Sequence, residues 1–482
     1  MKSILEYRKQ LDENIVTSEE LVQESLTLAY KNQKECNSFV TILDDVKGID
    51  DKTSLLSGIP YVVKDNLSTA GILTTGSSNT LKNYIPMFNA TVIEKLNRAG
   101  AVPIAKSVMD EFGMGGTGTT GHTGTVFNPW DNTRMTAGSS AGSAACVAAG
   151  VVPFALGTDT GDSIRKPAAF CGIVGYKPTY GLISRYGVFP FASSLDHVGV
   201  LTRSVEDACL SVDVMKGIDP KDQTSLDSSE MHLYDSLTGN IRGKKLFYIK
   251  NLLDLNAYEN PSDDLKSTFE QFENTIKLLE SKGAIVEGIE FDMALLNAIP
   301  TTYVCISCAE ATSNLSNMTG FSFGSRGEGS TYIESMKNHR TEGFSPLIKR
   351  RFVIGSYVLQ KENQEKFFLN AQRVRHLVVE KMNSLFETND AMIMPCSEGV
   401  ATKLDNGANM LQDGLLEVLE NLMVIGNFGG YPSITIPNGM IYDLPIGVNI
   451  TGKVRDDANV LNIAYTLESL MPYKNQIAGS VK

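Results

Sequence analysis

One lysine and three serines are the residues of this chain whose types and settings could support nucleophilic chemistry. Lys64 ends the apolar run GIPYVVK (58–64), where burial would lower the pKa of its amine and let it accept a proton. Ser139 and Ser140 lie in AGSSAGSAA, and Ser163 lies in TGDSIR. Glycine-rich turns at a helix start can direct backbone N–H groups toward an anion. The sequence therefore offers a base, a nucleophile and an oxyanion hole.

Three other motifs favour structural roles. GMGGTG (113–118) has the spacing of a dinucleotide-binding loop, but no strand pattern precedes it and no apolar helix pattern follows it. CISC (305–308) is a single C-x-x-C in an apolar, helix-like stretch, which favours packing cysteines over a metal site. Asp196 and His197 are adjacent, and adjacent side chains rarely face the same partner, so we do not expect a Ser-His-Asp triad.

The elements that must position the lysine and the serines alternate between strand and helix patterns. Thr17 with Glu20 forms a capping-box signature before a helix over 17–30. Further patterns predict strands at 58–64, 101–106, 151–159, 391–397 and 432–452, and helices at 90–100, 143–150 and 458–470. The alternation predicts the α/β class. We expect a single domain over 1–482, with a helical excursion or long surface segment at about 217–290.

Composition excludes several classes of protein. The 482 residues contain 43 Lys and Arg against 55 Asp and Glu, a net charge of -12 that repels polyanions and argues against an extensive nucleic-acid surface. The seven cysteines are scattered and odd in number, which indicates a reducing compartment rather than a disulfide framework. Charges interrupt the first residues, and the longest apolar run is short, so we expect neither a signal peptide nor a membrane span.

Three segments together carry a resemblance to a known family. GIPYVVKDN, AGSSAGSAACVAAGVVPFALGTDTGDSIRKPAAFCGIVGYKPTYG and SSLDHVG closely resemble the amidase signature family, which uses a Ser-Ser-Lys triad. Lys64 and Ser139 are 75 positions apart, and Ser139 and Ser163 are 24 apart, which match the family's separations. The resemblance implies the amidase signature fold, a central, mostly parallel mixed β-sheet flanked by helices on both faces.

The resemblance also implies a role for each of these residues. Ser163 would attack an amide carbonyl, Ser139 on a cis peptide bond would relay the proton, and neutral Lys64 would be the final base. An oxyanion hole would be formed by the backbone N–H groups of Thr160, Gly161, Asp162 and Ser163. We expect no metal site in this chain.

Within the family, MDEFGMGG (109–116), SRYGVFPFASSLDHVG (184–199) and EATSNLS (310–316) are most similar to the A subunits of bacterial glutamyl-tRNA(Gln)/aspartyl-tRNA(Asn) amidotransferases. Such an enzyme hydrolyses glutamine on its A subunit through an acyl-enzyme and passes ammonia to its B subunit. The B subunit holds the misacylated tRNA and is expected to use ATP and Mg²⁺, while the C subunit completes a heterotrimer. The resemblance therefore implies no cofactor in this chain, no membrane and a cytoplasmic location.

A glutamine substrate needs a cation for its carboxylate and an anion for its ammonium. By position in the family pattern, these would be Arg351 and Glu420, with Tyr303 nearby. The alternative is that Arg351 lies on a solvated helix face and Glu420 is a surface acid. Several positions depart from the family pattern, among them Asp162 in place of a usual glycine and Glu420 in place of a usual aspartate. We expect the Asp162 side chain to point away from the site or to be hydrogen-bonded, so Asp162→Gly should leave the glutaminase activity similar or improved.

Two other functions remain open on the sequence. The departures near Ser163 are compatible with a stand-alone amidase that hydrolyses small amides. They are also compatible with a glutaminase-impaired scaffold subunit of the same complex, although Lys64, Ser139 and Ser163 are all retained.

Overall fold

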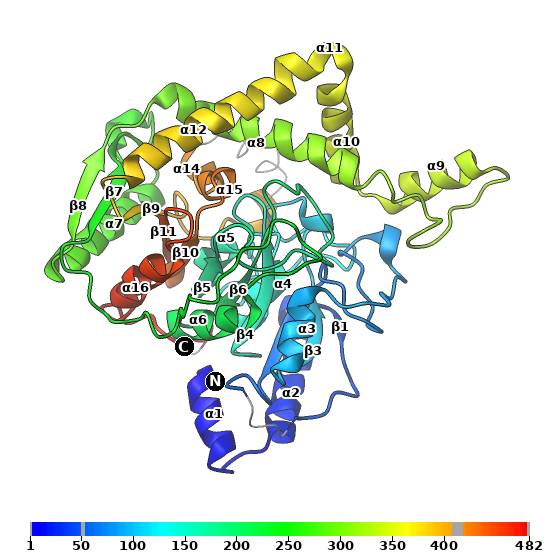
Figure 1. The fold of residues 1–482 in the computed structure, drawn as a ribbon, viewed down its shortest axis with the longest axis horizontal. Helices are drawn as coiled ribbons and strands as arrows, with labels where there is room; N and C mark the ends of the chain where they lie inside the picture. Colours follow the sequence, from blue (N-terminus) through cyan, green and yellow to red (C-terminus); the bar gives the residue numbers. More distant parts are fainter. Residues whose placement is uncertain (1, 50–53, 407–417, 480–482) are drawn as a thin grey trace.

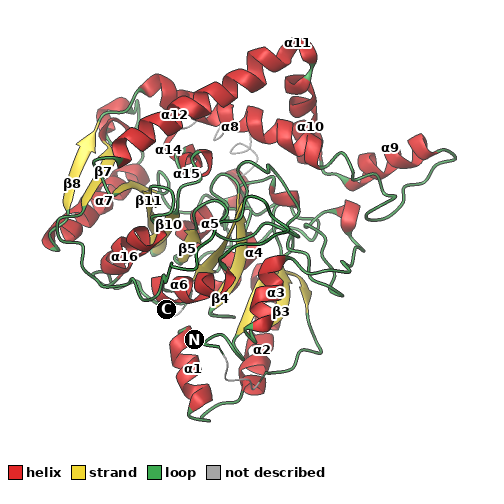
Figure 2. Cartoon of the chain, viewed as in Figure 1, coloured by secondary structure: helices red, strands yellow, loops and turns green. Residues whose placement is uncertain are grey.

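The computed structural model describes residues 2–49, 54–406 and 418–479. Within them, one sheet of eleven strands crosses the molecule in the order β1-β3-β2-β4-β6-β5-β10-β11-β9-β7-β8 (Figure 1). Helices cover both faces of this sheet, as the α/β prediction requires (Figure 2). The strands are β1 (Phe39–Ile42), β2 (Pro60–Lys64), β3 (Val102–Ser107), β4 (Phe154–Asp159), β5 (Val174–Lys177), β6 (His197–Thr202), β7 (Lys245–Ile249), β8 (Ile285–Ile289), β9 (Ala391–Pro395), β10 (Ser433–Ile441) and β11 (Leu444–Gly452).

The helices follow the strands and also form a separate layer. They are α1 (Ile4–Asp12), α2 (Ser18–Cys36), α3 (Thr91–Arg98), α4 (Ala141–Ala148), α5 (Arg165–Cys171), α6 (Val205–Met215), α7 (Asp263–Ser281), α8 (Met293–Asn314), α9 (Tyr332–Gly343), α10 (Pro346–Leu359), α11 (Lys361–Gln364), α12 (Asn370–Phe386), α14 (Val418–Asn421), α15 (Val424–Phe428) and α16 (Asp457–Glu468). The capping box predicted at Thr17 and Glu20 is present, with each side chain bonded to the other residue's backbone N–H.

The sheet is mixed, as expected, but the expectation that it is mostly parallel is wrong. Of the ten strand pairs in the described residues, six are antiparallel and four are parallel. The parallel pairs lie in β3-β2-β4 and β9-β7-β8, toward the two ends of the sheet. The middle is antiparallel because β10 and β11 form a hairpin and β6 inserts between β4 and β5.

The sequence predicted a helical excursion or a long surface segment at about 217–290, but the mostly helical part of the chain begins after residue 290. Residues 217–290 contain β7, α7 and β8, and both strands pair into the common sheet. The helices α8, α10 and α12 come next and form a layer at one side, from which α9 projects (Figure 1). Gly355 of α10 lies so close to α8 that an added Cβ would be 2.1 Å from the carbonyl oxygen of Cys308. Cys308 is buried, and so the CISC motif serves packing, as expected.

The small residues of α4 allow it to approach the sheet closely. An added Cβ at Gly142 would lie 2.2 Å from the carbonyl oxygen of Ser38 and 2.8 Å from the amide nitrogen of Val108. This close packing fixes the start of α4, and the start of α4 carries the serine pair. Among the helices of the described residues, none combines the length and the apolar character needed to cross a membrane.

Candidate active site

Lys64 is the last residue of β2, and its side chain is completely buried. Its Nζ lies 2.9 Å from Ser139 Oγ and 2.8 Å from Ser140 Oγ, and it donates to the carbonyl oxygen of Thr158 at 3.1 Å. Burial lowers the pKa of Lys64 to about 7, although nearby carboxylates, Asp159 foremost, act to raise it. The amine can therefore be neutral near neutral pH, as the apolar run predicted.

Asp110 fixes the turn that carries Ser139. The peptide bond between Gly138 and Ser139 is cis, as the family resemblance implied. An added Cβ at Gly138 would lie 1.9 Å from Asp110 Oδ2, and the amide nitrogen of Asp110 donates to the carbonyl oxygen of Ser139 at 3.2 Å. The carboxylate of Asp110 also accepts from the amide nitrogens of Gly118 and Thr120, at 3.0 and 3.2 Å. The glycine-rich GMGGTG loop therefore wraps around a carboxylate of the chain itself and supports the serine turn, which agrees with the rejection of a dinucleotide site.

Ser163 lies on the turn between β4 and α5 and is 3% exposed. Its carbonyl oxygen accepts from the amide nitrogen of Ser140 at 3.1 Å, so the backbone brings the three serines to one place. In the described residues, no hydrogen bond joins the hydroxyls of Ser163 and Ser139. Catalytic hydrogen bonds often tighten only when the substrate binds, and a serine Oγ can change partner by rotating about one bond.

The turn at residues 160–163 presents a row of backbone donors. Within the described part of the chain, the N–H groups of Thr160, Gly161, Asp162 and Ser163 donate no hydrogen bond, whereas that of Ile164 donates to Asp159 Oδ2 at 3.0 Å. Unused donors beside a buried serine are what a developing oxyanion requires. The backbone at Gly161 and Asp162 does not have a positive φ, so an aspartate replaces the family's glycine there without strain.

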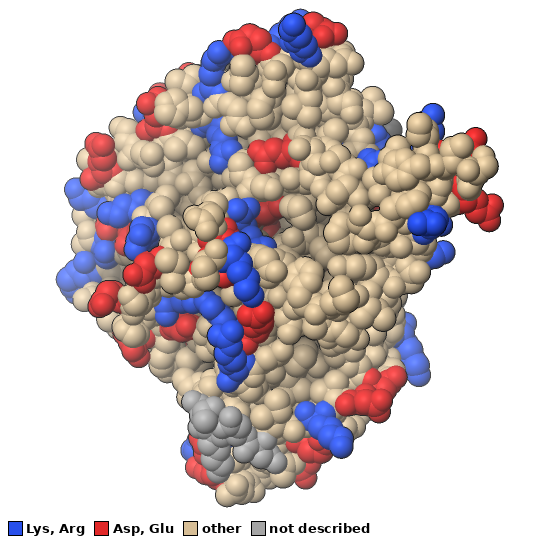
Figure 3. Space-filling view, turned by 45° about the vertical axis from the view of Figure 1, so that its right-hand side comes forward, with Lys and Arg blue, Asp and Glu red and all other residues tan. Residues whose placement is uncertain are grey.

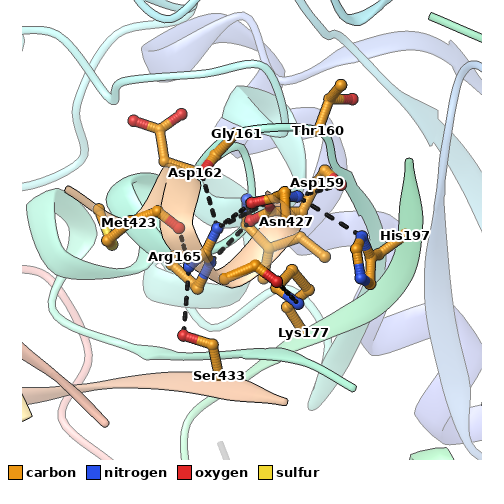
Figure 4. A network of polar contacts seen from close by, with 12 residues as sticks. Asp159, Thr160, Gly161, Asp162, Arg165, Lys177, His197, Met423, Asn427 and Ser433 are labelled. Carbon is orange, nitrogen blue, oxygen red and sulfur yellow. Dashed lines mark hydrogen bonds and ion pairs between the residues drawn. The ribbon is translucent and has the colours of Figure 1, made fainter. Parts of the chain in front are cut away.

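Arg165, at the start of α5, stabilises the turn at residues 160–163 through buried hydrogen bonds, an arrangement that we call the Arg165 brace (Figure 4). Its completely buried guanidinium binds both carboxylate oxygens of Asp159, at 2.9 and 3.1 Å, and donates to the carbonyl oxygen of Gly161 at 2.7 Å. It also donates to Asn427 Oδ1 at 2.7 Å and to the carbonyl oxygen of Met423 at 2.8 Å. Burial alone would raise the pKa of Asp159, but Arg165 holds it below its usual range. The sequence analysis missed this brace, although an arginine in a buried apolar helix is a signal for it.

Asp196 and His197 do not form a triad with a serine. The carboxylate of Asp196 accepts from Thr160 Oγ1 at 2.6 Å and from the amide nitrogen of Phe191 at 2.9 Å. His197 is buried in β6, and its Nδ1 lies 2.7 Å from the carbonyl oxygen of Leu195. Asp196 thus positions the beginning of the nucleophile turn, which agrees with the sequence-based rejection of a triad.

Tyr303 and Arg351, predicted to bind substrate, come from α8 and α10. The ring and hydroxyl of Tyr303 lie against Gly161, where an added Cβ would be 3.1–3.2 Å from them. Burial raises the pKa of Tyr303, while the positive charge of Arg351 acts to lower it. The guanidinium of Arg351 lies 5.5 Å from the ring centre of Phe191, and its buried Nε has no hydrogen-bond partner within the described residues. Arg351 is therefore half-buried rather than fully solvated.

Glu420, the third predicted substrate residue, also lies near the nucleophile turn but is bound to the protein. Its carboxylate binds Lys166 Nζ and accepts from the amide nitrogen of Glu398 at 2.7 Å. Lys166 Nζ also donates to the carbonyl oxygen of Glu420 at 2.7 Å and lies 3.9 Å from Asp162 Oδ2. Burial raises the pKa of Asp162 to about 6, although Lys166 acts to lower it. No sequence pattern singles out Lys166, because a lysine next to Arg165 resembles an ordinary charged helix end.

The described residues contain no group of three or more His, Cys, Asp or Glu side chains that could hold a metal ion.

A buried lysine with a lowered pKa, a serine pair and a serine on a turn of unused N–H groups are together the arrangement of the class of lysine-dependent serine hydrolases. The family model described as Amidase matches residues 20–461, and the chain belongs to that family. The resemblance found in the sequence is therefore confirmed.

Curated relatives extend over nearly the whole chain. The A subunit of glutamyl-tRNA(Gln) amidotransferase from Geobacillus thermodenitrificans is 38% identical over 460 residues, covering 95% of this chain and 92% of the relative. The same protein from Thermoanaerobacter pseudethanolicus is 37% identical over 494 residues, covering 100% and 99%.

Solved structures agree with the fold. The crystal structure of the A subunit of glutamyl-tRNA(Gln) amidotransferase from Thermotoga maritima has a TM-score of 0.82 at 33% identity and covers 98% of this chain and 96% of its own. A bacterial aryl acylamidase has a TM-score of 0.83 at 22% identity, covers 99% of this chain and 98% of its own, and supports the fold alone.

Proposed function

We propose that this chain is the glutamine-hydrolysing subunit of a tRNA-dependent amidotransferase. It would supply ammonia for converting misacylated Glu-tRNA(Gln), or Asp-tRNA(Asn), to the amidated aminoacyl-tRNA. The observation that carries the proposal is the buried Lys64 bonded to Ser139 beside the turn of Ser163. This constellation occurs in a chain that is similar over its length to A subunits of such enzymes.

The first half of the reaction forms an acyl-enzyme. Ser163 Oγ attacks the side-chain amide carbon of glutamine, and its proton passes through Ser139 Oγ to Lys64 Nζ. The carbonyl oxygen becomes an oxyanion that accepts hydrogen bonds from the unused N–H groups of residues 160–163. One such donor lowers the activation free energy by about 3 to 4 kcal/mol. The C–N bond then breaks as the proton returns through Ser139 to the leaving nitrogen, which departs as ammonia.

The second half frees the enzyme. Water attacks the ester carbon of the acyl-enzyme and gives its proton to Lys64 through Ser139. The proton returns to Ser163 Oγ as the ester bond breaks, and glutamate leaves. Each atom and proton is thus accounted for by the three residues and one water molecule.

The proposed pocket also fits the carboxylate of glutamine. The buried Nε of Arg351 has no hydrogen-bond partner within the described residues, which supports its role as the cation. An arginine is suited to this because its guanidinium can bind a carboxylate through two parallel hydrogen bonds.

Partner subunits would complete the reaction. We propose B and C subunits in a heterotrimer, with tRNA, ATP and Mg²⁺ bound by the B subunit. The net charge of -12 supports this division, because such a chain attracts tRNA poorly. On the face shown in Figure 3, basic and acidic residues lie among one another, and the described part of this face has no continuous basic surface. The seven cysteines are free thiols, which supports a reducing, cytoplasmic location.

The test compares Ser163→Ala with the unchanged chain in the reconstituted three-subunit complex. With glutamine as donor, we expect amidation of Glu-tRNA(Gln) to fall by roughly 10⁴-fold or more. With ammonium chloride as donor, amidation should continue, because free ammonia bypasses the glutaminase; this is the control for an assembled complex.

Two results would contradict the proposal. Unchanged glutamine-dependent amidation by the Ser163→Ala complex would leave only a scaffold role. Rapid hydrolysis of simple amides by the isolated chain, with no increase for glutamine when the partners and Glu-tRNA(Gln) are added, would identify a stand-alone amidase.

A further inference from the structure

Three charged side chains meet beside the nucleophile and form what we call the acid–lysine cluster: Asp162, Lys166 and Glu420. Lys166 lies between the two carboxylates, bound to Glu420 and 3.9 Å from Asp162 Oδ2. Arg165, the residue before Lys166, is paired with Asp159, so its positive charge is balanced outside the cluster. The cluster therefore holds one positive and two negative side chains when both acids are ionised, which leaves one negative charge without a cation.

The unbalanced charge lies on Asp162 rather than on Glu420. Lys166 donates to the carbonyl oxygen and to the carboxylate of Glu420, and the second carboxylate oxygen of Glu420 accepts from the amide nitrogen of Glu398. Within the described residues, the Asp162 carboxylate accepts no hydrogen bond and has only the longer contact to Lys166. Its side chain is 25% exposed, against 12% for Glu420. Asp162 is thus the carboxylate that can still take a cation.

Asp162 also lies next to the proposed nucleophile. It directly precedes Ser163, and in Figure 4 its carboxylate points away from the network of Arg165 and Asp159. The neighbouring residue, Gly161, lies against the ring and hydroxyl of Tyr303. The α-ammonium and the α-carboxylate of glutamine are bonded to the same carbon, so a glutamine with its amide at Ser163 and its carboxylate at Arg351 places the ammonium beside the carboxylate, in the same pocket.

We propose that Asp162 is a specificity-determining residue, which binds the α-ammonium of the substrate, while Lys166 neutralises Glu420. The inference rests on the proposed function and deepens it. It changes two expectations taken from the sequence, because Glu420 loses the ammonium role and Asp162→Gly is no longer expected to leave glutamine hydrolysis unaffected.

The experiment uses the three-subunit complex with two donors, L-glutamine and glutaramate, which is glutamine without its α-amino group. In Asp162→Asn, we expect kcat/KM for glutamine to fall by roughly 10- to 100-fold, because a hydrogen bond between charged groups is lost. Most of the fall should appear in KM. Hydrolysis of glutaramate should change by less than about 3-fold, which also shows that the variant is folded.

Asp443→Asn is the matched control, because it makes the same change of charge at an exposed residue in the turn between β10 and β11. It should leave the preference for glutamine over glutaramate unchanged. The inference is overturned if Asp162→Asn keeps that preference, since Glu420 would then bind the ammonium. It is also overturned if Asp162→Asn loses both activities together. Absence of glutaminase activity in the unchanged complex would instead refute the proposed function, and this inference with it.

Discussion

The amine of Lys64 can act as a base only after it has lost its proton. Burial lowers its pKa to about 7, so protonation falls from mostly complete at about pH 6 to mostly absent at about pH 8. We therefore expect kcat/KM to rise about tenfold per pH unit below about 7 and to level off above it. The pH profile should be measured with glutaramate, whose binding does not require an ionised Asp162. A profile that stays flat between about pH 5.5 and 8.5 would show that Lys64 is not the base.

Gly138 is needed because no other residue leaves room for Asp110. An added Cβ would lie 1.9 Å from Asp110 Oδ2, and so Gly138→Ala must displace either the carboxylate or the Ser139 turn. We expect a loss of glutaminase activity of about 100-fold or more together with a lower Tm.

Gly116→Ala is the control for Gly138→Ala, because a Cβ at exposed Gly116 meets nothing within 4 Å. Its stability should change by less than about 0.5 kcal/mol. If Gly138→Ala behaves in the same way in thermal unfolding and in the glutaminase assay, Asp110 does not position Ser139.

At the scale of elements, Arg165 joins α5 to β4 and to the residues around α15. Arg165→Met removes the only cation bound to the completely buried Asp159 among the described contacts. An unpaired buried carboxylate costs about 3 to 5 kcal/mol, so we expect the free energy of unfolding to fall by that amount. Urea denaturation measures it, and glutaminase activity should fall as the nucleophile turn loosens.

Arg373→Met is the control for this variant. Arg373 forms an exposed ion pair with Glu365, which contributes no more than about 1 kcal/mol. Equal, small effects of the two substitutions on unfolding would show that the brace contributes little to stability.

The sequence predicted the positions of single strands and helices better than the parallel or antiparallel pairing of the strands. The strand patterns at 58–64 and 151–159 and the capping box at Thr17 depend on local residue order, and the structure contains all of them. Strand direction depends on which distant strands pair, and no local pattern encodes the insertion of β6 between β4 and β5. For the same reason, the expected excursion at 217–290 proved to contain strands of the common sheet.

At the scale of the whole molecule, the sequence predicted which residues form the active site better than it predicted which side chains hold them in place. Lys64, Ser139 and Ser163 carry a recognisable spacing, and the structure brings them together. The ion-pair partner of Glu420 could not be predicted, because Lys166 and Glu420 are 254 positions apart in the sequence and come together only in the folded protein. The roles of Tyr303 and Arg351 stay predictions, with a placement that is compatible with them.

The brace of Arg165 has a consequence for the order in which function appears during synthesis. Its partners Met423, Asn427 and Ser433 lie 258, 262 and 268 positions further along the chain. A nascent chain that has not yet emerged from the ribosome to this point carries its complete Ser-Ser-Lys set on a turn that lacks these three contacts. Since folding during synthesis proceeds from the N-terminus, hydrolytic competence arrives only after residues 423–433 have been made. A nascent chain that stops short of these residues would therefore not consume glutamine without delivering its ammonia to a partner.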